Sequence, residues 1–170
     1  MQQILNPSHD PSLRIAWCRD VFFLIERTHQ TGYPYTDPPI GPIILSTATP
    51  EGSILKSLAD SAVPLVLQIA ASLPVPPSNA SATPKLPLYV AEAIAFRAFL
   101  QSTGAFPSFV PHNPRAAFRD YETAGRNGFA SAWFRLGRDY ENFNDHQHAK
   151  DCFERGVRLG VESCLYVCSY

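Results

Sequence analysis

A 32-residue repeat in the last third of the chain constrains its fold more than any other feature. Moving Asn113–Arg138 forward by 32 positions places it on Asp145–Tyr170, and residues of the same kind then coincide. The identical pairs are Ala117 with Ala149, Glu122 with Glu154, Arg126 with Arg158, Gly128 with Gly160 and Ser131 with Ser163. A period of about 20 to 50 residues is typical of stacked units that bury their apolar faces only against their neighbours.

The pattern within each unit predicts a pair of helices. Asn113 before Pro114 is a helix N-cap with proline in the first turn, and Gly128 closes that helix as a C-cap. Asp145 and Gly160 bound the equivalent helix of the next unit. Small residues alternate with aromatic ones, which lets antiparallel helices approach closely. We expect the packing framework to be Ala117, Tyr121, Gly128, Ala132, Leu136, Gly137, Tyr140, Ala149, Phe153 and Gly160.

The predicted fold class is therefore all-α: an α-solenoid of antiparallel helix pairs with a proline-rich, irregular middle and an incomplete last repeat. We divide the chain into a loose N-terminus (1–10), a helical region with proline-rich loops (11–87) and the repeat region (88–170). The proline-rich stretch 73–87 is predicted to be a surface linker of undetermined role.

Three local predictions apply to the chain before the clean repeat. The first helix, Pro11–Thr28, is expected to bury a stripe of apolar residues: Leu13, Ala16, Trp17, Val21, Leu24 and Ile25. The second, Ser53–Ser72, contains Pro64, which predicts a kink or a break near Val63. The third runs from Tyr89 to Ser102, and Thr103-Gly104 after it stops the helix.

Two apolar stretches between these helices are also assigned from their composition. The segment 43–45 is apolar, and we expect it to lie extended on a helical face, because no partner strand is evident. The apolar loop 106–112 should fold back onto the helices.

Composition and charge narrow the classes of function. The formal net charge of −1 gives no electrostatic reason to bind nucleic acid or an anionic membrane. The four cysteines lack the even spacing of a disulfide scaffold, which indicates a reducing compartment. No secretory signal and no run of 18 apolar residues is evident, so we expect a cytoplasmic protein without an integral membrane segment.

The residues that could carry chemistry are few. His146, His148 and Cys152 are close together, but a closed zinc site needs four ligands and a fourth is not obvious. Cys164 and Cys168 lack a general base placed by sequence, as a thiol nucleophile would require. No phosphate-binding loop or catalytic motif is found. We therefore expect no catalytic residue, no metal and no cofactor.

The repeat resembles a known family. Residues that match the pattern of Sel-one-like repeats, the short-helix-pair relatives of tetratricopeptide repeats, are Ala132, Leu136, Gly137, Tyr140, Asp145, Ala149, Phe153 and Gly160. The match covers 88–170, where an earlier unit around 92–97 fits after a longer loop at 103–112. Two departures stand out: Asn142-Phe143-Asn144 replaces a glycine-rich turn, and Gly156-Val157 replaces paired alanines.

With its proline-rich entry and the segment 113–122, the whole chain resembles fungal repeat proteins of the chitin-synthase-regulator type. The resemblance implies a non-catalytic scaffold or adaptor that binds other proteins through stacked helices. The implied partners are chitin synthase or the machinery of cell polarity, at a cytoplasmic location peripheral to the cell cortex.

Two alternatives stay open. One is a metal-binding or hydrolytic protein with its site in the N-terminal half or around His146, His148 and Cys152. The other is a fragment without independent function, because Cys168 occupies the position of Leu136 and the last unit stops inside a helix. A truncated solenoid without its cap is expected to aggregate, and added repeats should raise its melting temperature.

Overall fold

The computed structural model describes residues 4–29, 41–72 and 85–168. Throughout these ranges the only regular structure is helical, with no strand. The helices, in chain order, are α1 (Pro11–His29), α2 (Pro50–Ala71), α3 (Leu88–Thr103), α4 (Pro114–Arg126), α5 (Ser131–Asn142), α6 (His146–Arg158) and α7 (Glu162–Cys168). The protein is thus all-α, as predicted.

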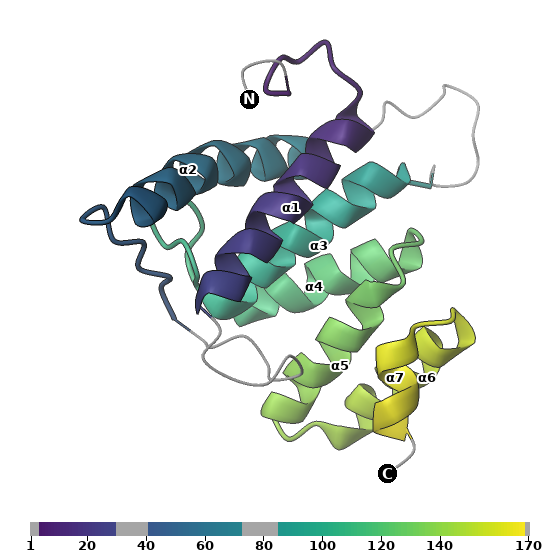
Figure 1. Ribbon diagram of the computed structural model, residues 1–170. Coiled ribbons are helices and arrows are strands. Elements are labelled where there is room, and N and C mark those ends of the chain that lie inside the picture. Colours follow the sequence, from purple (N-terminus) through teal and green to yellow (C-terminus); the bar gives the residue numbers. More distant parts are fainter. Residues whose placement is uncertain (1–3, 30–40, 73–84, 169–170) are drawn as a thin grey trace.

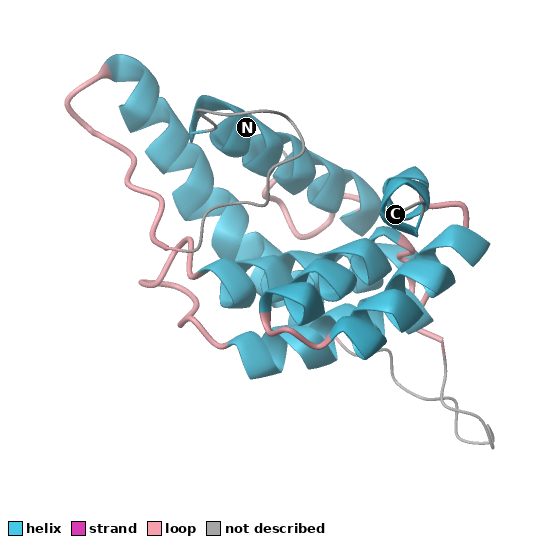
Figure 2. Ribbon diagram, turned by 90° about the horizontal axis from the view of Figure 1, so that it is seen from below, coloured by secondary structure: helices cyan, strands magenta, loops and turns pink. Residues whose placement is uncertain are grey.

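The seven described helices pack sequentially, each against the next, and α1 also reaches α3 (Figure 1). Helices α1 and α2 lie at one end of this arrangement and α6 and α7 at the other (Figure 1). The described connections between helices, pink in Figure 2, are loops and turns. One buried apolar cluster runs from Ile15 in α1 to Cys152 in α6. A smaller cluster of Ala149, Phe153 and Cys164 lies between α6 and α7.

The predicted repeat is confirmed at the level of helix positions. Helices α4 and α6 have 13 residues each, and their ends are 32 positions apart. The Asn113 side chain accepts a hydrogen bond from the Ala116 amide, and Asp145 does the same for His148. The turns that follow also match, with positive φ angles of 102° at Gly128 and 81° at Gly160. Only glycine adopts this conformation at little cost, which explains why both positions keep it.

Most of the predicted helix ends are found within one residue, but α2 differs. It begins at Pro50, because the Thr49 side chain accepts a hydrogen bond from the Gly52 amide and caps the helix there. It also continues through Pro64 to Ala71, so of the predicted kink or break near Val63 the break does not occur. The Pro64 ring is exposed while Val63 and Leu65 are buried, so tertiary packing on both sides holds the helix together across the missing donor.

The predicted buried stripe of α1 is partly wrong. Leu13 and Leu24 are 62% and 44% exposed, whereas Cys18 is fully buried. The residues that actually face the core are Arg14, Ile15, Cys18, Val21, Phe22 and Ile25. Apolar residues surround α1 on all sides, so their periodicity does not single out one face, and contact with α2 and α3 selects it.

The two apolar stretches before α4 lie as predicted. Ile43 donates its backbone N–H to the Ala105 carbonyl, and Ile43 and Leu45 pack against the core without forming a strand. In the loop after α3, Phe106 and Val110 are buried in the core. The φ of +66° at Gly104 ends α3 as a left-handed C-cap.

Ion pairs fix the register between neighbouring helices. The Glu92 carboxylate on α3 is buried and accepts two hydrogen bonds from the Arg19 guanidinium on α1, at 2.6 and 3.0 Å. Arg97 on α3 binds Asp120 on α4 in the same two-pronged manner, at 2.7 and 2.9 Å. Bidentate guanidinium–carboxylate pairs add directional specificity to apolar packing.

Helix α2 is the one described helix that is long and apolar enough to cross a membrane by length and composition. In this structure its buried side chains pack between α1 and α3. The residues that α2 buries are all apolar, as expected for the inward face of a helix in a core.

Candidate functional site

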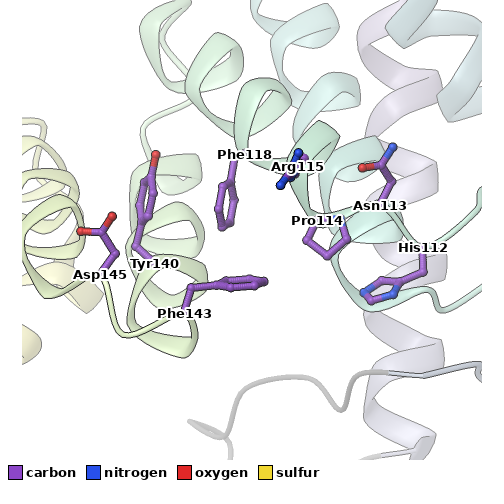
Figure 3. Close-up of a pocket in the computed structure, with 8 residues that line it drawn as sticks. All are labelled: His112, Asn113, Pro114, Arg115, Phe118, Tyr140, Phe143 and Asp145. Atoms are coloured by element: carbon purple, nitrogen blue, oxygen red, sulfur yellow. The ribbon is translucent and has the colours of Figure 1, made fainter.

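A groove opens where the first turn of α4 faces the end of α5 and the turn into α6. Its volume is about 570 Å³. The residues that line it are His112, Asn113, Pro114, Arg115, Phe118, Tyr140, Phe143 and Asp145 (Figure 3). The groove is open to solvent, and its lining is mainly apolar with a few polar groups.

Three aromatic rings form the floor of the groove. The Phe118 ring lies 4.8 Å from that of Tyr140 and 5.5 Å from that of Phe143, which it meets edge-on at 85°. Figure 3 shows the three side chains converging on one space. Phe143 is 61% exposed, so a large apolar side chain projects into solvent beside an open groove. Aromatic side chains placed in this way are common at binding surfaces.

The turn between α5 and α6 explains why Phe143 is presented. Asn144 adopts a φ of +60°, a left-handed conformation that asparagine tolerates better than most residues. The Asp145 amide then donates back to the Tyr140 carbonyl, which closes the turn. The turn at 142–144 thus leaves the aromatic side chain of Phe143 exposed beside the groove.

Opposite charges lie at the two ends of the groove. At the α4 end, Arg115 is exposed and forms no ion pair with any described residue. At the α6 end, the Asp145 carboxylate accepts from the His148 amide at 3.2 Å and contacts His148 Nδ1 at 2.7 Å. These contacts, the backbone hydrogen bond foremost, lower the pKa of Asp145 below its usual value. The His148 ring also stacks on the Tyr140 ring, with their centroids 5.1 Å apart.

The candidate metal ligands do not converge. Cys152 is buried, and loss of solvent raises the pKa of its thiol to about 12, so it stays protonated at neutral pH. The Nδ1 atom of His148 instead lies 2.7 Å from Oδ2 of Asp145. Within 4–29, 41–72 and 85–168, no three His, Cys, Asp or Glu side chains are grouped to hold a metal ion. Cys164 is likewise buried, and burial raises its pKa to about 11, which disfavours the thiolate that a nucleophile needs.

The ten predicted framework positions have structural roles. Those that are buried or half-buried between helices are Ala117, Tyr121, Ala132, Leu136, Gly137, Tyr140, Ala149 and Phe153. The other two, Gly128 and Gly160, form the turns after α4 and α6. Gly137 lies directly beneath the Phe153 ring.

The groove combines residues of α4, of α5 and of the turn into α6, and no sequence motif marks it. Phe118 packs partly against the core and also lines the groove, whereas Phe143 is 61% exposed beside it. The unusual aromatic residue in the turn at 142–144 is the signal that could have pointed to it.

No family model, curated protein or solved structure matches this chain. The fold and the groove therefore define its class by themselves: an all-α protein of sequentially packed helices with an aromatic-floored groove at one edge.

Proposed function

We propose that this protein is a non-catalytic scaffold of the Sel-one-like, tetratricopeptide-like solenoid type, and that it binds other proteins through its stacked helix pairs. The observation that carries the proposal is the groove floored by Phe118, Tyr140 and Phe143. The repeated helix pair α4–α5 and α6–α7, with caps and glycine turns 32 residues apart, supports the solenoid class.

The groove suits an extended peptide segment of a partner protein. Its floor offers apolar rings for side-chain burial, and exposed large aromatics at a concave site contribute much of the energy of protein association. Arg115 at one end and Asp145 at the other give the groove a polarity that would orient a bound peptide. By resemblance, the partners we propose are chitin synthase or proteins of the cell-polarity machinery, met in the cytoplasm at the cell cortex.

Two phenylalanines of nearly equal exposure allow a matched test of whether the groove binds the partner. Phe143 in the groove is 61% exposed and Phe23 on α1 is 62% exposed, so Phe143→Ala and Phe23→Ala remove similar solvent-accessible apolar surface from different places. Purified cytoplasmic segments of chitin synthase serve as the probe, with binding to the immobilised 170-residue chain followed by interferometry. We expect Phe143→Ala to weaken binding about tenfold or more and Phe23→Ala to leave it unchanged.

Circular dichroism and thermal unfolding are measured for both variants as a check that they are folded. Equal loss of binding in the two variants, or no effect of Phe143→Ala on a measurable interaction, would remove the groove from the proposal. Absence of any binding by the parent chain would refute the proposed partner.

A further inference from the structure

Helix α1 carries apolar residues on its outer side as well as on the side that faces the core. Phe23 and Leu24 are 62% and 44% exposed, and Leu13 on the same helix is 62% exposed. In Figure 1, α1 lies in front of α2 and α3, the helices against which it packs. A helix that is hydrophobic all round is normally buried on all sides. The outer side of α1 therefore has the composition of a contact surface.

Four residues form a continuous face in the C-terminal half of this helix, which we call the α1 outer face. They are Asp20, Phe23, Leu24 and Arg27, spaced as i, i+3, i+4 and i+7, which places them on one side of a helix. All four are exposed. At 1.5 Å per residue, Phe23 lies about 18 Å along the helix from Pro11, where α1 begins. The face therefore belongs to the body of the helix and not to its start.

The charges at the two ends of the α1 outer face are not used by the fold. Neither Asp20 nor Arg27 forms an ion pair with another residue in the part of the chain that the structure describes. They cannot pair with each other, because seven residues separate them by about 10 Å along the helix. The neighbouring Arg19 does not take up Asp20, because its guanidinium is bound by Glu92 at 2.6 and 3.0 Å.

We propose that the α1 outer face pairs with the same face of a second copy of this protein, with the two helices antiparallel. A two-fold axis between Phe23 and Leu24 places Asp20 of each copy beside Arg27 of the other, because these residues lie at equal distances on either side of the axis. The two apolar side chains cover those of the second copy at the centre. Such an isologous contact needs a patch that is complementary to itself, and this one is.

The order of the charges selects the antiparallel arrangement. In a parallel pair, each Asp20 would face the other Asp20 and each Arg27 the other Arg27, and like charges in an interface are unfavourable. The contact covers only about two turns of helix, so we expect a weak dimer. No residue of α1 lines the groove, so the proposal does not depend on the proposed function, and each copy keeps its own groove.

Sedimentation equilibrium of the 170-residue chain tests the pairing. A reductant keeps the exposed Cys168 from forming disulfides between chains. At about 0.2 mM, a concentration that still populates a weak contact, we expect a species of twice the 18.8 kDa of one chain. A chain that stays monomeric at this concentration overturns the proposal.

Charge reversals test whether Asp20 meets Arg27 of the second copy. Asp20→Arg and Arg27→Asp, made singly, each bring like charges together and should raise the dimer dissociation constant about tenfold or more. The double variant restores opposite charges in exchanged positions and should return the constant to within about threefold of that of the parent chain. Arg119→Asp is the matched control, because Arg119 is exposed on α4 and the substitution changes the net charge as Arg27→Asp does. It should leave the constant unchanged.

Phe23→Ala tests the apolar centre of the same contact and should also weaken the dimer about tenfold. Recovery of the dimer in the double reversal supports the proposal, because a variant that had merely lost its fold would not recover. A double variant as weak as the single ones overturns it. So does a dimer that the reversals or Phe23→Ala leave unchanged, or one that Arg119→Asp weakens equally.

Discussion

Replacement of Gly137 by alanine tests the close contact between α5 and α6. A Cβ atom at this position would lie 2.4 Å from Phe153 Cε1 and 2.8 Å from both Cδ1 and Cζ. Ordinary contact begins at about 3.4 Å, so the ring would have to move by about 1 Å. Phe153 is only 3% exposed and its ring lies 6.1 Å from that of Phe134, which leaves little room for that movement.

Two opposing effects decide the sign of the change in stability. In a helix interior, glycine to alanine normally stabilises by about 0.5–1 kcal/mol, because the unfolded chain loses freedom. Overpacking a well-filled core costs about 1–3 kcal/mol. Because the clash involves a rigid ring, we expect overpacking to dominate and Gly137→Ala to destabilise by about 1–2 kcal/mol. For a chain of this size, that corresponds to a melting temperature lower by roughly 2–8 °C.

Urea unfolding followed by circular dichroism measures this free energy, and a double-mutant cycle isolates its cause. Phe153→Leu removes the ring edge and costs about 1–2 kcal/mol by itself. Combined with Gly137→Ala, it should be less destabilising than the sum of the two by at least about 1 kcal/mol, since alanine then meets a flexible side chain. A Gly137→Ala variant as stable as the parent, or fully additive effects, would refute this account of the helix contact.

Three further predictions follow from single contacts. Arg19→Met leaves the buried Glu92 carboxylate without its bidentate partner and should reduce the free energy of unfolding by about 1–3 kcal/mol. Lys56→Met removes one partner of an exposed ion pair and should cost less than about 0.5 kcal/mol. Equal losses in urea titrations would contradict the stabilising role of the Arg19–Glu92 pair. Gly160 has a φ of +81°, and an added Cβ atom would meet no other atom, so Gly160→Ala should lower stability by about 1 kcal/mol through backbone strain alone. Gly160→Asn should cost less. A melting temperature unchanged by the alanine substitution would disprove the strain. The pKa of Asp145 is lowered in the folded state, so its carboxylate stabilises the fold fully at neutral pH. This stabilisation is lost as the pH falls below 3.8, the usual pKa of the group. Asp145→Asn should therefore make the free energy of unfolding depend less on pH in this range, and an unchanged dependence would show that Asp145 does not contribute to it.

The local features of the repeat could be read from the sequence because they depend on neighbouring residues. Asn113 and Asp145 cap helices through amides three positions away, and Gly128 and Gly160 turn the chain through their own dihedral angles. Such short-range effects favour the same residue types at helix ends in any protein, so they can be recognised from the sequence. The helix pairs of the repeat and their 32-residue spacing followed from this logic.

Features that depend on distant contacts were decided only by the tertiary structure. The buried side of α1 was set by α2 and α3, because apolar residues on all sides of α1 give no periodic signal. The groove required Phe118 from α4 and Phe143 from the turn at the end of the next helix, α5, and the packing of α4 on α5 brings their rings to 5.5 Å. Residue types near in sequence predict how a segment folds, whereas which surfaces meet depends on the summed packing of the whole chain.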